Sequence, residues 1–305
     1  MIEFATLEAN GFKGFYARSE REAHKCLILV VGEEGNGYIE RCAAKYFNSR
    51  GINVLLLGMH QKSSEVPGLR RFDLGVIEAA IEWLRERGEE KVGILGASMG
   101  AQVALAAAER MPQLSLVIGF APIDYVTEGY YQGNKRGMKE WPAGCSALSY
   151  EGEELFYQPY YLKEEEFWKL YYENTMRQRE LTSGAIFEHS EKHTRVPEKC
   201  FIKTEAIAGK LLLFAAEDDS MWNSALYCKR IAKRRRAQDK EDLTEIHVYP
   251  YGTHLLYPQG LIVQMLSVFS GIVDKPYRSG RKNSRRCKEA RMDVEEKLWK
   301  AIRAW

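Results

Sequence analysis

Short apolar runs of strand length alternate along the chain with segments of helical periodicity. In the segment 69–87, for example, Leu74, Ile77, Ile81 and Leu84 recur at helical spacing. Strands that alternate with helices favour a mostly parallel sheet covered by helices on both faces, so we expect a single α/β domain over residues 1–305. The predicted strands are Phe4–Leu7, Gly14–Ala17, Leu27–Val31, Ile52–Leu57, Lys91–Leu95, Leu114–Phe120, Lys210–Ala215 and Thr244–Tyr249, and the predicted helices are Tyr38–Arg50, Leu69–Arg87, Ala101–Arg110 and Ala225–Arg236.

One glycine-flanked serine lies where a predicted strand changes directly into a helix. The sequence Gly96-Ala97-Ser98-Met99-Gly100 follows the apolar run that ends at Leu95 and precedes a helix-forming run. A chain that reverses so sharply needs small residues beside the turn, and it exposes the serine hydroxyl above the edge of the sheet. An accidental G-x-S-x-G in a loop is the alternative, but the strand before and the helix after favour a nucleophile elbow.

A serine nucleophile needs a histidine base and an acid that orients it, and both follow along the chain. The strand 210–215 leads into Glu217, Asp218 and Asp219, and the strand 244–249 leads into a loop that contains His254. Carboxylates at the carboxyl end of a parallel strand lie where open α/β sheets place their sites. The order Ser, Asp, His along the chain is that of α/β-hydrolases.

An oxyanion hole in such a fold needs two backbone N–H groups. Met99 supplies the first, because it begins the helix after the elbow. The glycine-rich loop 32–37 follows an earlier central strand, and we expect the second donor to be Gly35, with Glu34 as the nearest alternative. A phosphate-binding turn of Rossmann type is disfavoured because the G-x-G-x-x-G spacing is missing.

The strand–helix alternation stops between Ala121 and Ala206. This stretch is rich in aromatic residues, including Tyr130, Trp141 and a predicted helix with Phe167, Trp168, Tyr171 and Tyr172. Because the stretch lies between the serine and the acid, we expect an insertion over 121–206 that folds over the site as a lid. Its aromatic side chains either shape an apolar substrate pocket or only pack the lid onto the body. We take Tyr130, Trp141 and, beside the acid, Trp222 as substrate-binding candidates.

Charge and composition exclude several other classes of function. Lysine and arginine number 44 against 42 acidic residues, and a net charge of +2 favours neither nucleic acid nor a membrane surface as the main partner. No signal-peptide pattern or membrane-length apolar run is found, and the six cysteines are scattered without a C-x-x-C pair, as is typical of a cytoplasmic protein. The other histidines lack metal-ligand spacing, so we expect neither a metal nor a cofactor.

A terminal amphipathic segment and two basic runs in the last third of the chain each allow two interpretations. The segment 283–305, with Val294, Leu298 and Ile302 at helical spacing, predicts an amphipathic helix that docks on the body or on a partner chain, so a homo-oligomer stays open. The basic runs 229–236 and 278–288 are either solvated helix faces or contacts for the phosphates of a CoA group.

From about Leu27 to Gly260 the chain resembles the α/β-hydrolase domain shared by acyl-CoA thioesterases and bile acid-CoA:amino acid N-acyltransferases, including stand-alone bacterial members. The resemblance rests on the glycine-rich loop, the G-A-S-M-G elbow, the segment E-D-D-S-M-W-N-S (217–224) and Y-P-Y-G-T-H (249–254). It implies a triad of Ser98, Asp219 and His254, with the second aspartate of D-D-x-x-W as the acid. The acyltransferase branch uses a cysteine nucleophile, so the serine favours transfer to water.

The sequence thus predicts a serine acyl hydrolase that acts on a small carboxylic ester or acyl thioester, with a CoA-linked substrate left open. An acyltransferase that passes the acyl group to an amine or alcohol is the first alternative. A non-catalytic binding protein on a hydrolase fold is the second, and it is of a different class.

Overall fold

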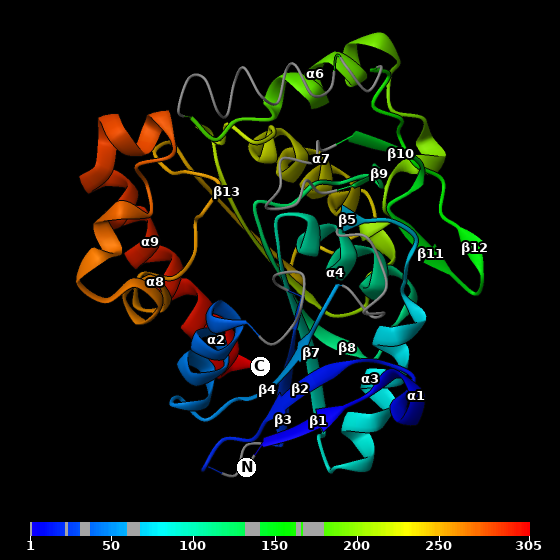
Figure 1. Ribbon diagram of the computed structural model, residues 1–305, viewed down its shortest axis with the longest axis vertical. Helices are drawn as coiled ribbons and strands as arrows, with labels where there is room; N and C mark the ends of the chain where they lie inside the picture. Colours follow the sequence, from blue (N-terminus) through cyan, green and yellow to red (C-terminus); the bar gives the residue numbers. More distant parts are fainter. Residues whose placement is uncertain are drawn as a thin grey trace.

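A single eight-stranded sheet forms the centre of the molecule (Figure 1). The computed structural model describes residues 2–21, 24–30, 37–59, 68–131, 141–162, 166 and 180–305, with only the backbone at 131, 141–142 and 268–270. The strand order is β1-β2-β4-β3-β7-β8-β13-β14; β2 is antiparallel to both of its neighbours, and the strands from β4 to β14 are parallel. The strands are β1 (Ile2–Ala5), β2 (Gly14–Ala17), β3 (Lys25–Val30), β4 (Asn53–Leu57), β7 (Lys91–Ala97), β8 (Leu114–Phe120), β13 (Lys210–Ala216) and β14 (Thr244–Tyr249).

Helices cover both faces of the sheet, and the alternation of side chains along β3 shows the two faces. Leu27 and Leu29 pack with the helices of one face, whereas Ile28 and Val30 pack with those of the other. Figure 1 shows α2, α8 and α9 together on one side and α3, α4 and α7 on the other. This is an α/β-hydrolase fold, as expected. The helices are α1 (Leu7–Asn10), α2 (Tyr38–Asn48), α3 (Gly75–Glu86), α4 (Met99–Arg110), α7 (Ser224–Arg236), α8 (Gln259–Leu266) and α9 (Arg278–Ala304), and η4 (Ser267–Ile272) is a 3-10 turn.

The last helix, α9, packs on the body of its own chain. Val294, Leu298 and Ile302 are almost completely buried in the same cluster as Leu27 and Leu29. The helix begins before the predicted start, at Arg278, and its backbone departs from helical angles at Asn283 (φ −129°, ψ 33°). The amphipathic pattern therefore indicates docking within the chain.

The predicted helix over 69–87 is wrong in its first part. The helix α3 begins at Gly75, and the residues before it form two short strands, β5 (Gly68–Leu69) and β6 (Phe72–Asp73). Leu69 pairs with Tyr130, and Phe72 pairs with Leu148, so strands from a distant part of the chain recruit these residues. Tertiary pairing thus overrides the local periodicity here.

The segment 121–206 forms small sheets and short helices beside the main sheet. Its strands combine with β5 and β6 in two three-stranded sheets, β10-β9-β5 and β12-β11-β6. Buried Glu128 ties the segment together, because its carboxylate accepts the backbone N–H of Gly144 (2.7 Å) and of Tyr160 (2.9 Å). The predicted helix with Phe167, Trp168, Tyr171 and Tyr172 lies outside the described residues. The elements are β9 (Glu128–Tyr131), β10 (Trp141–Ser146), β11 (Leu148–Tyr150), β12 (Glu153–Glu154), α6 (Gly184–His193), η2 (Glu198–Cys200) and η3 (Thr204–Ala206).

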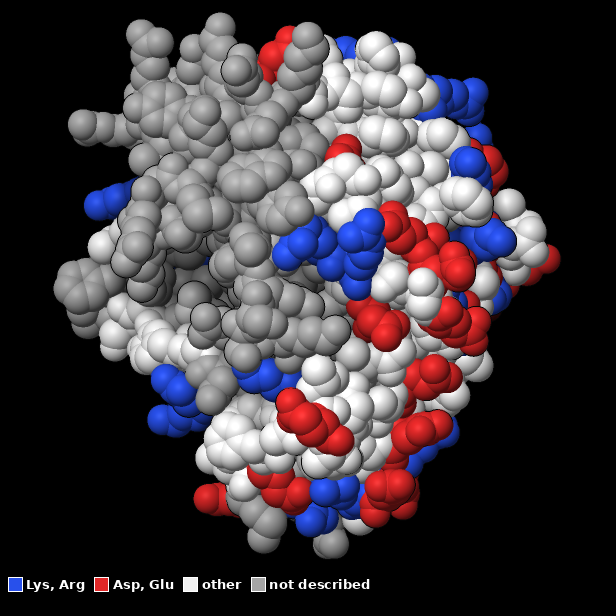
Figure 2. Space-filling view, turned by 45° about the vertical axis from the view of Figure 1, so that its right-hand side comes forward, with Lys and Arg blue, Asp and Glu red and all other residues white. Residues whose placement is uncertain are grey.

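Charges of both signs share the surface. On the face shown in Figure 2, the described Lys and Arg side chains are interspersed with Asp and Glu side chains. Across the described residues as a whole, several acidic and basic side chains pair directly, such as Arg71 with Glu154 (2.5 Å) and Arg234 with Glu198 (2.7 Å). Within the described part of the chain, no helix has the length and apolar composition needed to cross a membrane.

Candidate active site

The serine of the predicted elbow lies between β7 and α4 in a strained backbone conformation. Ser98 has φ of 56° and ψ of −127°, which residues other than glycine rarely adopt. There is no space for a side chain on either flanking glycine: a Cβ on Gly96 would overlap the backbone of Gly100, and one on Gly100 would overlap the carbonyl oxygen of Val30 in β3. The glycines of the motif are therefore required for close packing of α4 on the sheet.

The strands that precede the three predicted triad residues end at one edge of the sheet. Ala97 lies opposite Phe120, and Ala216 lies opposite Tyr249. Phe120 in turn pairs with Phe214, so the register runs continuously across β7, β8, β13 and β14. Because these strands are parallel, the loops after them meet above their carboxyl ends.

Asp219 lies in the loop after β13, and both of its carboxylate oxygens accept hydrogen bonds. One carboxylate oxygen accepts the backbone N–H of Met221 (3.0 Å), and the other accepts the hydroxyl of Ser224 (2.7 Å). Both oxygens also face the Nδ1 atom of His254, at 2.9 and 3.1 Å. The neighbouring Asp218 instead accepts the hydroxyl of Ser279 in α9 (2.8 Å). The geometry therefore brings the second aspartate, and not the first, to the histidine.

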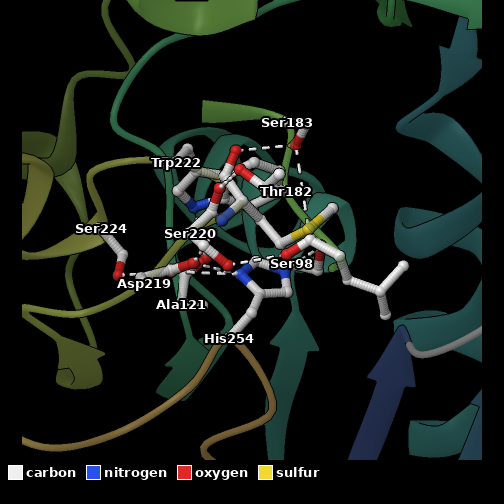
Figure 3. Close-up of polar contacts among 11 residues, drawn as sticks. Ser98, Ala121, Thr182, Ser183, Asp219, Ser220, Trp222, Ser224 and His254 are labelled. Atoms are coloured by element: carbon white, nitrogen blue, oxygen red, sulfur yellow. Dashed lines mark hydrogen bonds and ion pairs between the residues drawn. The ribbon is translucent and has the colours of Figure 1, made fainter. Parts of the chain in front are cut away.

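His254 connects this carboxylate to the serine. Its Nε2 atom lies 2.8 Å from the Ser98 Oγ atom, and Figure 3 shows the imidazole between the two partners. A Cβ on Gly252 would lie 2.7 Å from the Ala216 side chain, so the histidine loop packs directly on the strand that carries the acid. The side chains of His254 and Asp219 are 5% and 1% exposed.

The hydrogen-bond partners of His254 indicate which ring nitrogen carries the proton when the imidazole is neutral. The carboxylate at Nδ1 favours a proton on that nitrogen, which leaves the Nε2 lone pair to accept the serine hydroxyl. The buried thiol of Cys228 is a poor nucleophile, because burial, together with the negative charges of Asp124 and Asp219, raises its pKa well above its ordinary value. The arrangement can therefore transfer a proton from Ser98 to His254 while Asp219 holds the imidazole.

Of the predicted oxyanion-hole residues, the structure describes only Met99. This residue is the first of α4, directly after Ser98, and its side chain is buried. Its N–H belongs to the first turn of the helix, where N–H groups have no partner within the helix and the helix dipole favours negative charge. Gly35 and Glu34 lie outside the described residues.

Among the substrate-binding candidates, Trp222 is the one placed at the triad. Its ring meets the imidazole of His254 edge-on, with centroids 4.7 Å apart, and its Nε1–H donates to the carbonyl of Ala121 (3.1 Å). Tyr130 is half-buried in β9, where it packs against the main hydrophobic cluster. Trp141 belongs to β10, and its side chain lies outside the described residues.

The structure adds contacts from the segment 181–184, which the sequence did not suggest. The hydroxyls of Thr182 and Ser183 donate to the backbone carbonyls of Ser220 (2.8 Å) and Met221 (2.7 Å), and the Gly184 N–H also donates to Ser220 (3.1 Å). Figure 3 shows these hydroxyls above the acid loop. Residues 182–184 of the segment 121–206 are thus attached to the loop that carries Asp219. Serines and threonines outside any periodic pattern gave no signal for this contact.

A cavity of about 620 Å³ lies between α6 and the acid loop. Its lining combines apolar side chains with carboxylates, and Asp219 is one of the lining residues. Among the described residues, no cluster of histidine, cysteine and acidic side chains is arranged to hold a metal ion. The residues that line the cavity include Phe187, Trp222, Leu226, Tyr227, Glu191 and Glu217.

The sequence comparison identifies the family. The model of the BAAT / acyl-CoA thioester hydrolase C-terminal family matches residues 72–261, which include Ser98, Asp219 and His254. The chain belongs to this family. Fold and family together define a hydrolase of the α/β type. No curated protein matches the sequence.

Solved structures with similar folds are distant in sequence. An esterase from Pyrococcus furiosus is 12% identical, with 92% of this chain and 97% of that one covered and a TM-score of 0.49. An alpha/beta hydrolase from a Penicillium species is 17% identical over 84% of this chain and 91% of the other, with a TM-score of 0.47. A lipase-esterase related protein from Clostridium acetobutylicum is 16% identical over 84% and 97%, with a TM-score of 0.44.

Proposed function

We propose that the protein is a serine acyl hydrolase that cleaves a carboxylic ester or acyl thioester through an acyl-Ser98 intermediate. The observation that carries the proposal is the continuous chain of hydrogen bonds from Ser98 Oγ through His254 to Asp219. The strained elbow supports it, because such strain at a reactive side chain is typical of functional sites. The family description, which names acyl-CoA thioester hydrolases, favours an acyl thioester as the substrate class.

In the first half of the proposed reaction, the Ser98 hydroxyl attacks the acyl carbon while its proton passes to Nε2 of His254. The tetrahedral oxyanion is held by the Met99 N–H and by a second N–H, which we assign to Gly35 or Glu34. Collapse of this intermediate breaks the bond to the leaving group, and the alcohol or thiol takes the proton from His254.

In the second half, water attacks the acyl carbon and gives a proton to His254; the bond between the acyl carbon and Ser98 Oγ then breaks, His254 returns the proton to Oγ, and the carboxylic acid leaves. Asp219 keeps its charge throughout and stabilises the imidazolium.

We also propose that the insertion over 121–206 acts as a lid, which its attachment to the acid loop supports. We further propose that the protein is cytoplasmic, as its cysteine pattern indicates.

A fluorophosphonate probe and a substrate panel test the proposal. We expect the wild-type protein to be labelled at Ser98 and to hydrolyse either p-nitrophenyl esters or acyl-CoA thioesters. Ser98→Ala should lose labelling and lower kcat by about 10⁶-fold, as loss of a serine nucleophile does in other hydrolases. Its circular dichroism spectrum should match that of the wild type.

The alternatives give different results. An amide product formed when an amine such as glycine is added to the thioester assay would favour an acyltransferase. A folded wild-type protein that the probe does not label would favour a non-catalytic binding protein.

A further inference from the structure

A buried ion pair lies behind the histidine loop, outside the family match. Asp274 and Arg291 are 1% and 2% exposed, and the Arg291 Nη1 atom lies 2.6 Å from both carboxylate oxygens. The Arg291 Nε–H also donates to the side-chain oxygen of Gln259 (2.9 Å) at the start of α8. The pair thus joins α9, the start of α8 and the turn between them.

Such a pair contributes little net stability. Removing two charges from water has a large free-energy cost, and the attraction between them offsets this cost only with good geometry. A buried pair can, however, hold neighbouring groups in one arrangement, because each partner has strict hydrogen-bonding requirements. The question is therefore which group the pair holds.

The carboxylate of Asp274 also accepts a hydrogen bond from the residue next to the histidine. The Thr253 hydroxyl donates to Asp274 Oδ1 at 3.3 Å, and Thr253 is 2% exposed. On the other side of Thr253, Gly252 packs against Ala216 at the end of β13. The loop that carries His254 is thus held at two successive residues, once by the acid strand and once by the ion pair.

The first turn of α9 adds contacts to the same region. A Cβ on Gly280 would overlap the carbonyl oxygen of Asp274, so α9 lies directly against the turn that carries this carboxylate. Ser279 donates to Asp218, the residue before Asp219. The segment 274–291 therefore contacts both loops that carry the partners of Ser98.

We propose that Thr253, Asp274 and Arg291 are positioning residues, which hold the His254 imidazole in line between Ser98 and Asp219. This inference rests on the proposed function. Arg291 holds the Asp274 carboxylate, the carboxylate holds the Thr253 hydroxyl, and Thr253 sets the position of the histidine. None of the three contacts the reacting atoms, so they act on proton transfer and not on substrate binding.

The test compares Thr253→Val, which keeps the shape and removes the hydroxyl, with Thr253→Ser, which keeps the hydroxyl. We expect Thr253→Val to lower kcat by about tenfold, the size of one hydrogen bond to a charged group, with KM unchanged. Thr253→Ser should restore most of the lost kcat. Both variants should be folded, as checked by circular dichroism.

Arg291→Met tests the ion pair itself, with Arg285→Met as the matched control on the same helix, since the Arg285 side chain is 93% exposed. Arg291→Met should lower kcat and the melting temperature together, because Asp274 is then buried without its counter-charge. Arg285→Met should leave both unchanged.

A readout that needs no turnover separates this inference from the proposed function. The proton–nitrogen NMR spectrum of the histidine rings should show one tautomer for His254 in the wild type and an averaged signal in Thr253→Val. Wild-type kcat and an unchanged His254 signal in Thr253→Val would overturn the inference, as would a serine variant as impaired as the valine one. If the wild-type protein shows no hydrolase activity but the His254 signal still changes in Thr253→Val, the proposed hydrolase function is contradicted. The positioning role of Thr253 is then still supported.

Discussion

The nucleophile and its two partners are held in different ways. Ser98 is held by its own neighbours in the chain and by the central strand next to it, through Gly96, Gly100 and Val30. Asp219 and His254 lie on loops supported by distant segments. The acid loop is attached to residues 182–183 before α6, and the histidine loop is attached to the turn before α9.

This difference shows which part of the site is self-contained. At the elbow, the close approach of Gly96 to Gly100, together with packing on the adjacent strand at Val30, determines where the hydroxyl lies. For the other two residues, alignment depends on contacts between segments that are far apart in the sequence. We therefore expect substitutions at the elbow to affect the nucleophile or the stability of the fold, and substitutions around the two loops to affect alignment.

The largest expected effect separates the two aspartates of the acid loop. Asp219→Asn should lower kcat by up to about 10⁴-fold, because an amide at this position favours the wrong imidazole tautomer. Asp218→Asn should cost less than about tenfold, since its oxygen still accepts the Ser279 hydroxyl. Measurement of kcat for both variants decides the assignment. A large loss of kcat in Asp218→Asn, with kcat retained in Asp219→Asn, would show that the acid is the first aspartate.

An alanine at the elbow tests whether local crowding holds the nucleophile. Gly100→Ala should lower the free energy of unfolding by about 1–3 kcal/mol or more, because its Cβ would overlap the Val30 carbonyl oxygen. Gly271→Ala is the matched control, since among the described residues, its chain neighbours aside, its Cβ would meet no atom within 4 Å. Urea unfolding followed by circular dichroism gives both values. Equal stability of the two variants would mean that the elbow can relax.

The smallest expected effect concerns a contact between α9 and β14, the strand before the loop that carries His254. Asp293 accepts the hydroxyl of Tyr249 (2.7 Å) and pairs with Lys297. Burial raises the pKa of Asp293, but Lys297 and Tyr249 outweigh this effect and lower it overall. The charged carboxylate therefore stabilises the fold above its unfolded pKa of about 3.9, and this contribution is lost as the pH falls through the lower folded pKa.

Asp293→Asn should accordingly lower the free energy of unfolding at pH 7 by less than about 1 kcal/mol, because the pair is partly exposed to solvent. The difference from the wild type should shrink as the pH falls below about 4. Urea unfolding over this pH range provides the measurement, with exposed Glu296→Gln on the same helix as control. A difference that stays constant with pH would show that the charge of Asp293 plays no part.

Much of the fold could be predicted from the sequence. Short apolar runs identified the central strands, and β2, β8 and β14 have the predicted bounds. The predicted start of α3 was wrong because Leu69 and Phe72 pair with β9 and β11, strands from a distant part of the chain, and this pairing leaves no local signal. The register that aligns the ends of β7, β13 and β14 is likewise a property of the sheet.

The sequence by itself indicated the elbow, because a strand that turns directly into a helix needs adjacent small residues, and it determined the order of the serine, acid and histidine candidates. The family resemblance implied Asp219 as the acid, whereas the residues alone left Glu217, Asp218 and Asp219 as equivalent candidates. Only the tertiary structure shows the contacts, in which Asp219 faces the histidine and Asp218 accepts the Ser279 hydroxyl, since neighbouring carboxylates differ in direction and not in chemistry. It also decided that Thr253, Asp274 and Arg291 form one buried chain of contacts. Burial and hydrogen-bond partners depend on segments that the sequence separates, so no local pattern could reveal them.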